Sequence, residues 1–566
     1  MKRFWVECFV VFLFLTAYGQ SAMVSLERAE SLSSMADFYF TAGNYDKAID
    51  YQEQALDMIG ILSGKNSFDY ASLSLTLANY YYSKGRNYLS NSDVSAKRCY
   101  SNAIESLMKA IGVINDSLLV DYDRMDSKDK TNLWQQVCPL YDRLLPCYVS
   151  FCQNDTTLST LYNSVLFSKG ITWRDYKKAK EGDWKFIQKK LHTDDLAIEF
   201  ISPVNLEEDN ISFYALVLDN KCNAPRMIRL FDILQLQDSL KCATSKFDKN
   251  LKIGKLIWKP LEKDLQGIKN VYFSATHVLH NIPIEFCPMN DSSYYADKYN
   301  IYRLSSTMEL VYDIMKPQYD NAVLYGGLEY DYENKTITSN DRAGLEFLNN
   351  TGVEVSAICR LLQNAGVKCV AYTGSSGTES SFRHLTGKDI KILHVSTHGK
   401  YELYSDTSKF VIEEDALSHS YLVFSGANQR LIDSSIKDEN DGIVTALDIS
   451  RMKLSTLDLV CLSACESALG VYGDDDGIIG LQKGFKMAGA NTILMSVDKV
   501  DDEAIKILMV EFYKNLMNGK SKQQSLKDAQ IHLRQVDNGK YDKPEYWASA
   551  YSGDSRSPIP MISVHS

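Results

Sequence analysis

Two short stretches decide the fold, IKILHVSTHG at Ile390–Gly399 and LDLVCLSACE at Leu457–Glu466. Each is a run of strand-forming residues that ends in a reactive side chain, His398 in the first and Cys465 in the second. A short, nearly all-apolar run bounded by turn residues is typical of a strand buried on both faces of a parallel sheet. In open α/β sheets, reactive groups gather at the carboxyl ends of such strands. The two stretches therefore predict a thiol nucleophile and its general base.

Strands and helices alternate around these stretches from about Leu191 onward, which predicts βαβ units and a mainly parallel sheet. Two strand-like runs on either side of an acidic turn, Leu196–Ser202 and Ile211–Val217, indicate a hairpin. The later pattern predicts, among others, a buried strand at Val271–Ala275, a helix at Ile478–Met487 and a last strand at Tyr546–Tyr551.

The first part of the chain has a helical apolar period from Leu26 to about Ile114, and the pattern repeats. Small and aromatic residues recur at the offsets of a tetratricopeptide repeat, in which small residues let paired helices approach. These residues are Met35, Ala36, Tyr39, Gly43, Asn44, Tyr45, Ala48 and Ala55 in one copy, and Leu77, Ala78, Tyr81, Gly85, Tyr100, Ala103, Leu107 and Ala110 in the next. An irregular helical bundle with chance alanine spacing is the alternative. A solenoid of such repeats offers a surface for a protein partner or regulator.

The N-terminus follows the plan of a secretory signal peptide. Lys2 and Arg3 precede the apolar run Phe4–Ala17, and Ala17-Tyr18-Gly19 forms a small-x-small site before Gln20. The run is about 14 residues, shorter than the about 20 that cross a bilayer. We therefore expect residues 1–22 to direct export to the periplasm or the exterior, with no membrane span after cleavage. A retained N-terminal anchor is the alternative.

Composition excludes several classes of function. The net charge of −11 and the absence of a basic stripe argue against nucleic acid as a partner. The 12 cysteines form no C-x-x-C pair, and none lies at zinc-ligand spacing to a histidine, so we expect neither a metal nor a cofactor. We expect most of the cysteines to be inert core residues.

Several ordered motifs resemble the CHAT domain, a caspase-like cysteine peptidase family that is found joined to tetratricopeptide repeats. The motifs are LHNIPIEF at Leu279–Phe286, AVLYGG at Ala322–Gly327, LHVSTHG at Leu393–Gly399, LVCLSACESALG at Leu459–Gly470, GIIGLQKGFKMAGANTILMS at Gly477–Ser496, VDDEA at Val500–Ala504 and YWASAYSGD at Tyr546–Asp554. The expected fold is thus an α-helical repeat region at 23–190, followed by a caspase-like α/β domain at 191–566 with a mainly parallel sheet.

The resemblance implies a cysteine endopeptidase with His398 as general base and Cys465 as nucleophile. It also implies an oxyanion hole formed by the backbone N–H groups of Gly399 and Cys465. We expect His394 and Cys461, four residues upstream in each strand, to be core residues. A glycine at 399 suits close approach of substrate to the backbone.

Substrate preference is open. In separases, related to this family, an acidic side chain after a strand end selects a basic residue, and the corresponding positions here are Asp501 and Asp502. A helix-capping role for these two residues is the alternative. Asp498 stands where many family members have Trp, which makes the borrowed pocket geometry less secure. Two other functions also remain open: a non-catalytic scaffold, and a thiol-dependent hydrolase that acts on a non-peptide acyl group.

Overall fold

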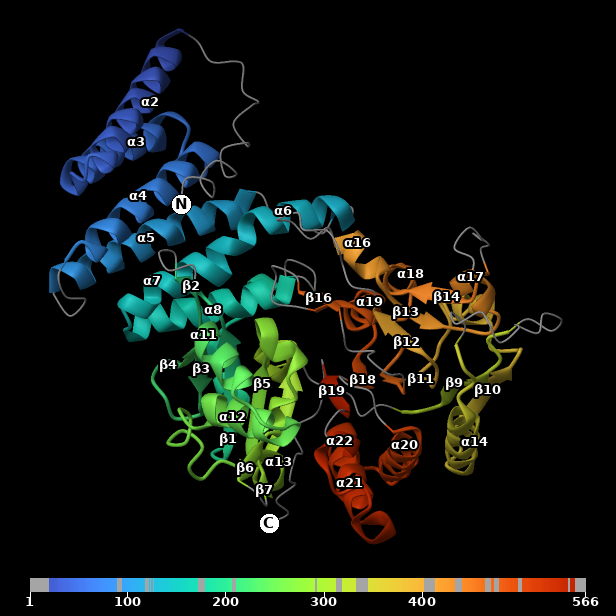
Figure 1. The fold of residues 1–566 in the computed structure, drawn as a ribbon. Helices are drawn as coiled ribbons and strands as arrows, with labels where there is room; N and C mark the ends of the chain where they lie inside the picture. The colour runs from blue at the N-terminus through green and yellow to red at the C-terminus, as the bar shows by residue number, and fades with distance from the viewer. Residues whose placement is uncertain are drawn as a thin grey trace, which may run out of the picture. The chain divides into compact units, whose positions relative to one another are not determined.

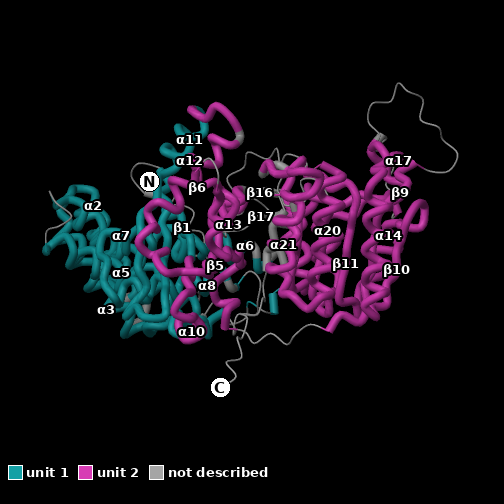
Figure 2. The backbone as a smooth tube through the Cα atoms, turned by 90° about the horizontal axis from the view of Figure 1, so that it is seen from below, with its two compact units in different colours: residues 1–185, 199–241 teal, residues 186–198, 242–566 magenta. Residues whose placement is uncertain are grey.

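The chain forms two compact units, one of residues 1–185 and 199–241 and the other of residues 186–198 and 242–566 (Figure 2). The computed structural model describes residues 20–88, 94–117, 122, 124–125, 127–171, 179–205, 210–290, 293–311, 318–331, 345–401, 413–432, 440–463, 470–472, 478–496, 501–547 and 550–554. Most of the predicted signal peptide and Cys465 lie outside these residues. The units are called unit 1 and unit 2 below.

Unit 1 is mainly helical (Figure 1). Its helices are α2 (Gln20–Thr41), α3 (Tyr45–Leu62), α4 (Phe68–Arg86), α5 (Val94–Ser117), α6 (Ser127–Pro139), the π-helical turn η3 (Leu140–Leu144), α7 (Leu145–Phe151), α8 (Asp155–Ile171) and α11 (Ile233–Lys241). It also holds the strands β2 (Val204–Asn205), β3 (Asn210–Leu218) and β4 (Arg226–Asp232). Helices α2 to α5 pack as consecutive neighbours, as stacked repeats require.

Two glycines explain how these helices meet. Gly43 has a φ of 77° in the turn between α2 and α3, a conformation that glycine adopts without a steric penalty. Gly85 lies against the ring of Tyr100, and a Cβ at this position would come within 2.8 Å of that ring. Asn44 caps α3 by accepting from the N–H of Lys47. The predicted small residues are thus those that set the turn and the helix spacing.

Buried polar contacts complete unit 1. The Lys169 ammonium lies 2.9 Å from Glu199 Oε2, and both side chains are almost fully buried. Lys169 also donates to the carbonyl of Phe200. In the core of the repeats, the amide of Gln52 donates to the carbonyl of Leu73. Because an unpaired buried charge is costly, Lys169 and Glu199 each depend on the other for their burial.

Unit 2 is built on a mainly parallel sheet with the strand order β10-β9-β11-β15-β18-β19-β8-β5. Its strands are β5 (Asn270–Ser274), β6 (Pro288–Asn290), β7 (Ser293–Tyr294), β8 (Asn300–Leu304), β9 (Asn321–Leu328), β10 (Lys368–Gly374), β11 (Ile392–Val395), β12 (Gly399–Tyr401), β13 (Ser420–Val423), β14 (Ile443–Thr445), β15 (Leu459–Leu462), β16 (Gly470–Tyr472), β17 (Ile478–Gly480), β18 (Thr492–Ser496) and β19 (Ala550–Asp554). The pairs from β10 to β18 are parallel, and β19 runs antiparallel to β18. A smaller antiparallel sheet has the order β12-β13-β14.

Helices cover both faces of the central strands. Figure 1 shows α14 and α20 on one side of the central strands β9, β11 and β18, and α16, α18 and α19 on the other. The helices of unit 2 are α12 (Lys246–Trp258), η4 (His277–Asn281), η5 (Ile284–Phe286), α13 (Tyr295–Lys298), η6 (Thr307–Val311), α14 (Asn349–Asn364), α15 (Glu379–Arg383), α16 (Glu413–Ser418), α17 (Asn428–Ile432), α18 (Ala446–Ser450), α19 (Leu481–Met487), α20 (Asp502–Met517), α21 (Lys522–Gln535), η7 (Val536–Gly539) and α22 (Pro544–Trp547). In addition, α10 (Trp184–Lys190) and β1 (Asp195–Ile201) each contribute residues to both units.

The predicted fold class is confirmed, and two element predictions are wrong. Residues Ile478–Gly480 were expected to begin a helix, but they form β17, which pairs with β16. Tyr546 and Trp547 were expected in a strand, but they lie in α22, and the last strand begins at Ala550. Trp547 packs edge-on against Tyr294 and donates its ring N–H to the carbonyl of Asp542. Tertiary contacts of this kind override local strand propensity.

Candidate active site

The two strands that decide the fold are adjacent and parallel. His394 of β11 pairs with Cys461 of β15, and Val395 pairs with Leu462. The ladder continues one step further, because Ser463 N–H donates to the carbonyl of Val395 at 2.9 Å. All residues of both strands are buried. The segment that carries His398 and the segment that leads to Cys465 therefore leave the sheet at the same edge.

His398 is half-buried, and its ring is held on two sides. Its Nε2 lies 2.9 Å from the backbone carbonyl of Glu346, and the Tyr330 ring lies 5.1 Å away at a tilt of 53°. A carbonyl can only accept, so Nε2 is the donor in this contact. In the neutral imidazole, Nδ1 is then the nitrogen that can accept a proton.

The backbone at His398 is held by its neighbours. The Thr397 hydroxyl donates to the carbonyl of Val423 at 2.6 Å and lies 2.9 Å from the Tyr330 hydroxyl. Val423 N–H donates to the carbonyl of His398 at 3.0 Å. Burial raises the pKa of Tyr330 to about 12, so this phenol stays neutral at physiological pH.

The segment that contacts His398 Nε2 is held by a buried amide. The Asn428 side chain accepts from Leu345 N–H at 2.7 Å, and it donates to the Leu345 carbonyl at 3.2 Å and to Asp331 at 2.7 Å. Asn428 is 2% exposed. Glu346 and Phe347, which follow Leu345, are exposed to solvent, and Phe347 keeps 51% of its surface exposed. Asn428 thus holds the segment whose carbonyl contacts His398.

Gly399 begins β12, an edge strand of the small sheet in the part of the chain that is described. It faces Leu422 of β13 in antiparallel register. Residue pairs in such ladders alternate between those that exchange hydrogen bonds and those whose N–H and C=O groups turn outward. Because the Val423 N–H bonds to the carbonyl of His398, the Gly399–Leu422 pair is of the outward kind. The Gly399 N–H therefore points away from β13.

The two predicted specificity residues lie at the start of α20, beyond the end of β18, the strand next to β15. Asp501 is the N-cap, and its Oδ1 accepts from Glu503 N–H and Ala504 N–H at 3.0 Å each. Asp502 lies in the first turn of the helix, and both aspartates are exposed. The capping role considered for Asp501 is thus present, and it leaves the carboxylate at the surface.

The upstream residues His394 and Cys461 are fully buried, as expected. Burial raises the pKa of the Cys461 thiol to about 12, so this cysteine stays protonated and unreactive at neutral pH. His394 Nε2 lies 2.9 Å from Glu354 Oε1 on α14. Core placement is therefore confirmed for both residues.

Other predicted features concern metals, thiols and membranes. Among the described residues, His, Cys, Asp and Glu side chains nowhere gather in threes that could hold a metal ion. The ten cysteines in the described part of the chain are all thiols, and most of them are buried. In the same part, no helix has the length and apolar character that crossing a bilayer requires.

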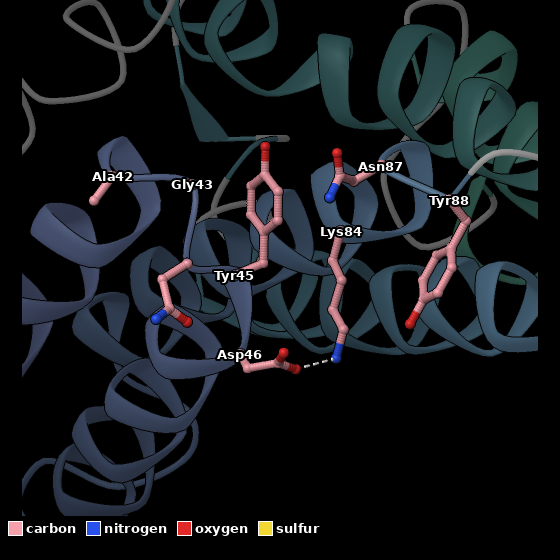
Figure 3. Close-up of a pocket in the computed structure, with 8 residues that line it drawn as sticks. Ala42, Gly43, Tyr45, Asp46, Lys84, Asn87 and Tyr88 are labelled. Carbon is pink, nitrogen blue, oxygen red and sulfur yellow. Dashed lines mark hydrogen bonds and ion pairs between the residues drawn. The ribbon is translucent and has the colours of Figure 1, made fainter.

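A polar pocket of about 380 Å³ lies on the repeats of unit 1 (Figure 3). It lies between the turn that joins α2 to α3 and the C-terminal end of α4. Asp46 and Lys84 form an ion pair of 2.6 Å at this site. The side chains of Tyr45 and Tyr88 also line the pocket. Phenol rings beside charged groups can bind a polar peptide segment.

Sequence reasoning missed the three supports of His398, which are Tyr330, the Glu346 carbonyl and Asn428. A backbone carbonyl has no sequence signature. Asn428 follows Gly426 and Ala427 in what reads as an ordinary polar loop. Only the fact that AVLYGG is followed closely by Tyr330 links one support to a recognised motif.

Comparison with solved structures finds distant similarities. Two structures of the Saccharomyces cerevisiae separase–securin complex match at 9% and 10% identity with TM-scores of 0.42 and 0.41. They cover 93% of this chain, which in turn spans only 44% and 47% of the chains it matches. The RgpB pro- and mature-domain complex of Porphyromonas gingivalis matches at 12% identity with a TM-score of 0.29, over 56% of this chain and 71% of that chain.

Comparison with sequences identifies the family. No curated protein matches the chain. Residues 27–87 match a tetratricopeptide repeat, and residues 251–554, more than half of the chain, match the CHAT domain. The chain therefore belongs to the CHAT domain family and carries tetratricopeptide repeats ahead of that domain.

Proposed function

We propose that this chain is a cysteine endopeptidase in which His398 is the general base and Cys465 is the nucleophile. The observation that carries the proposal is the register of β11 and β15. His394 of β11 pairs with Cys461 of β15. His398 lies four residues after His394, and Cys465 lies four residues after Cys461. Two segments that leave adjacent parallel strands after equal lengths bring a base and a thiol to one edge of the sheet.

The geometry at His398 suits this chemistry. Nδ1 takes the proton of the Cys465 thiol, while the Glu346 carbonyl holds the opposite nitrogen and stabilises the imidazolium that forms. The thiolate attacks the peptide carbonyl, and the oxyanion accepts from the N–H groups of Gly399 and Cys465. The imidazolium then protonates the departing amine. Water, deprotonated by the same imidazole, hydrolyses the thioester and restores the thiol.

We place substrate selection at the start of α20. We propose that one of these exposed acids, which follow the next parallel strand in sequence, meets a basic side chain on the substrate. Asp502 is the stronger candidate, since Oδ1 of Asp501 already caps the helix. Changing Asp502 to Ala is expected to lower kcat/KM for Arg and Lys substrates by at least about tenfold, through loss of a charge-assisted contact. An unchanged preference in both Asp501→Ala and Asp502→Ala rejects this assignment.

The repeats of unit 1 are the proposed site for a protein partner or regulator. A photo-crosslinker at Tyr45 or Tyr88, in the pocket of Figure 3, should capture that partner, and crosslinks confined to other helices speak against this pocket. We also propose that residues 1–22 direct export. N-terminal sequencing of the mature protein should then begin near Gln20, and a retained Met1 refutes cleavage.

One experiment separates the three functions. Wild type, His398→Ala and Cys465→Ala are incubated with a diverse peptide library, and cleavage is followed by mass spectrometry. The peptidase proposal expects cleavage by wild type alone. Equal cleavage by all three proteins rejects it, and no cleavage by any favours the scaffold. A thiol hydrolase that acts on other acyl groups would instead form a Cys465 acyl adduct with activated esters without cutting peptides.

A further inference from the structure

A continuous chain of buried polar side chains joins α14 and α20 to the two strands that lead to the candidate dyad. Glu354 of α14 accepts from His394 of β11 at 2.9 Å and from Ser396, the residue that follows β11, at 3.3 Å. On the other side of the His394 ring, Nδ1 lies 3.4 Å from the hydroxyl of Tyr513 on α20. The same hydroxyl also interacts with the Cys461 thiol of β15. All five side chains are at most 1% exposed.

Such a network is costly unless every member is satisfied, and an apolar core would be cheaper. Here the donors and acceptors match. The His394 Nε2–H donates to one carboxylate oxygen, its Nδ1 lies within reach of the Tyr513 hydroxyl, and the Ser396 hydroxyl donates to the second carboxylate oxygen. Burial holds the pKa of Tyr513 well above its usual value, so it remains a donor. The chain begins and ends on the two strands that lead to the reactive residues.

The position of Glu354 links α14 to the segment that leads to His398. His394 of β11 and Ser396 just after it lie on the same side of the sheet, because side chains alternate along extended chain and the Ser396 N–H still donates to the carbonyl of Tyr325 on β9 at 2.8 Å. The Glu354 carboxylate therefore bonds to this segment at two positions, His394 and Ser396, and Ser396 lies two residues before His398. The segment whose Glu346 carbonyl contacts His398 leads directly into α14, the helix that carries Glu354. One helix and its leading segment thus hold both the strand and the ring.

We propose that Glu354 is a positioning residue for the dyad. Through its hydrogen bonds to His394 and Ser396, it fixes the end of β11 that presents His398 to Cys465. This inference rests on the proposed function, because it assumes that the Cys465 thiol gives its proton to His398 and that the resulting thiolate and imidazolium form an ion pair. Glu354 touches neither substrate nor the reacting atoms.

The test measures the ion pair directly and needs no substrate. Full-length protein is alkylated with iodoacetamide between pH 5 and 9, and the rate at Cys465 is followed by mass spectrometry of its peptide. In wild type the neighbouring imidazolium lowers the thiol pKa, and His398→Ala should abolish that effect. If His398→Ala leaves the profile unchanged, the dyad and the proposed function fail together, whatever Glu354 does.

With the dyad established, Glu354→Ala should slow alkylation at pH 6.5 by about tenfold, equivalent to a rise of about one unit in the thiol pKa. Ser396→Ala loses one hydrogen bond only and should show the same change more weakly, should Glu354→Ala fail to fold. Glu354→Gln can accept from His394 with its oxygen and donate its amide N–H to the Ser396 hydroxyl, which can also accept, so it should stay within about twofold of wild type. A wild-type profile in both alanine variants overturns the proposal, and so does a glutamine variant as impaired as Glu354→Ala.

A matched control separates positioning from stability. Glu285 is another buried carboxylate of unit 2, and its bonds at 3.1 and 2.7 Å go to Arg303 on β8 rather than to β11 or β15. Glu285→Gln removes the negative charge of that ion pair and should lower the melting temperature. Its Cys465 profile should match that of wild type, because a lower melting temperature alone does not move the pKa of a folded site. A shifted profile in this control would assign the effect to general loosening and overturn the specific role of Glu354.

Discussion

Replacing Asn428 by Ala should loosen the segment that holds His398. The change removes three hydrogen bonds, of 2.7, 3.2 and 2.7 Å, and leaves the N–H and C=O of Leu345 without this partner. At about 0.5–1.5 kcal/mol for each net bond, and with water reaching the half-exposed segment, we expect a stability loss of about 2–3 kcal/mol in unit 2. The hydrogen bond between His398 Nε2 and the Glu346 carbonyl should then be formed for a smaller fraction of the time.

The catalytic cost follows from that contact. A carbonyl bonded to an imidazolium is worth about 1.5–3 kcal/mol, and about 1.4 kcal/mol corresponds to tenfold in rate. We therefore expect Asn428→Ala to lower kcat about tenfold with KM nearly unchanged. The assay is peptide hydrolysis well below the melting temperature, with circular dichroism as the check on folding. An unchanged kcat in a protein that melts earlier would refute the link between Asn428 and His398.

Asn428→Asp sharpens the test through its pH dependence. The new carboxylate would lie against Asp331 and the Leu345 carbonyl, so its folded pKa should be raised above that of the unfolded chain. A group with a raised folded pKa stabilises below its unfolded pKa, and this contribution is lost as pH rises through the folded value. The variant should therefore be least stable at neutral pH and recover on acidification, because the protonated acid can donate again. Wild type should show no such recovery at this site.

Three further predictions concern other parts of the molecule. Tyr330→Phe keeps the ring 5.1 Å from His398 and should retain activity within about threefold, whereas Tyr330→Ala should lose about tenfold or more in kcat/KM. Gly85→Ala would place a Cβ 2.8 Å from the Tyr100 ring and should destabilise unit 1 by about 1–3 kcal/mol in thermal melts, while the control Gly112→Ala, with nothing within 4 Å, should be neutral or stabilising. Burial opposes ionisation of Asp219, but the N–H groups of Lys221 and Cys222 and the Arg226 guanidinium together lower its pKa. The stability it contributes should be lost as pH falls below about 4, and Asp219→Asn should remove that part of the acid sensitivity of unit 1.

The amino-acid sequence reveals the sheet better than the site. Strands β11 and β15 are predictable because four consecutive buried residues leave no polar face. The repeats are predictable because Gly43 adopts a positive φ and Gly85 leaves room for the Tyr100 ring, and both positions favour glycine. Strand β17 is missed because it depends on pairing with β16. The hydrogen bond between Glu354 and His394 is missed because 40 residues separate the two side chains and only the fold brings them together.

The same distinction explains why His398 could be identified while its environment could not. The histidine follows its strand directly, so the strand pattern alone marks it. Its ring is held by the end of the β9 segment at Tyr330 and by the segment at Glu346, and its backbone by Val423 of β13. None of these groups lies within 20 residues of His398, and two of the contacts use a backbone C=O or N–H group, which carries no signature in the sequence. A site of this kind forms only when the whole of unit 2 is folded, so variants at Asn428 or Glu354 should alter reactivity without touching either reactive residue.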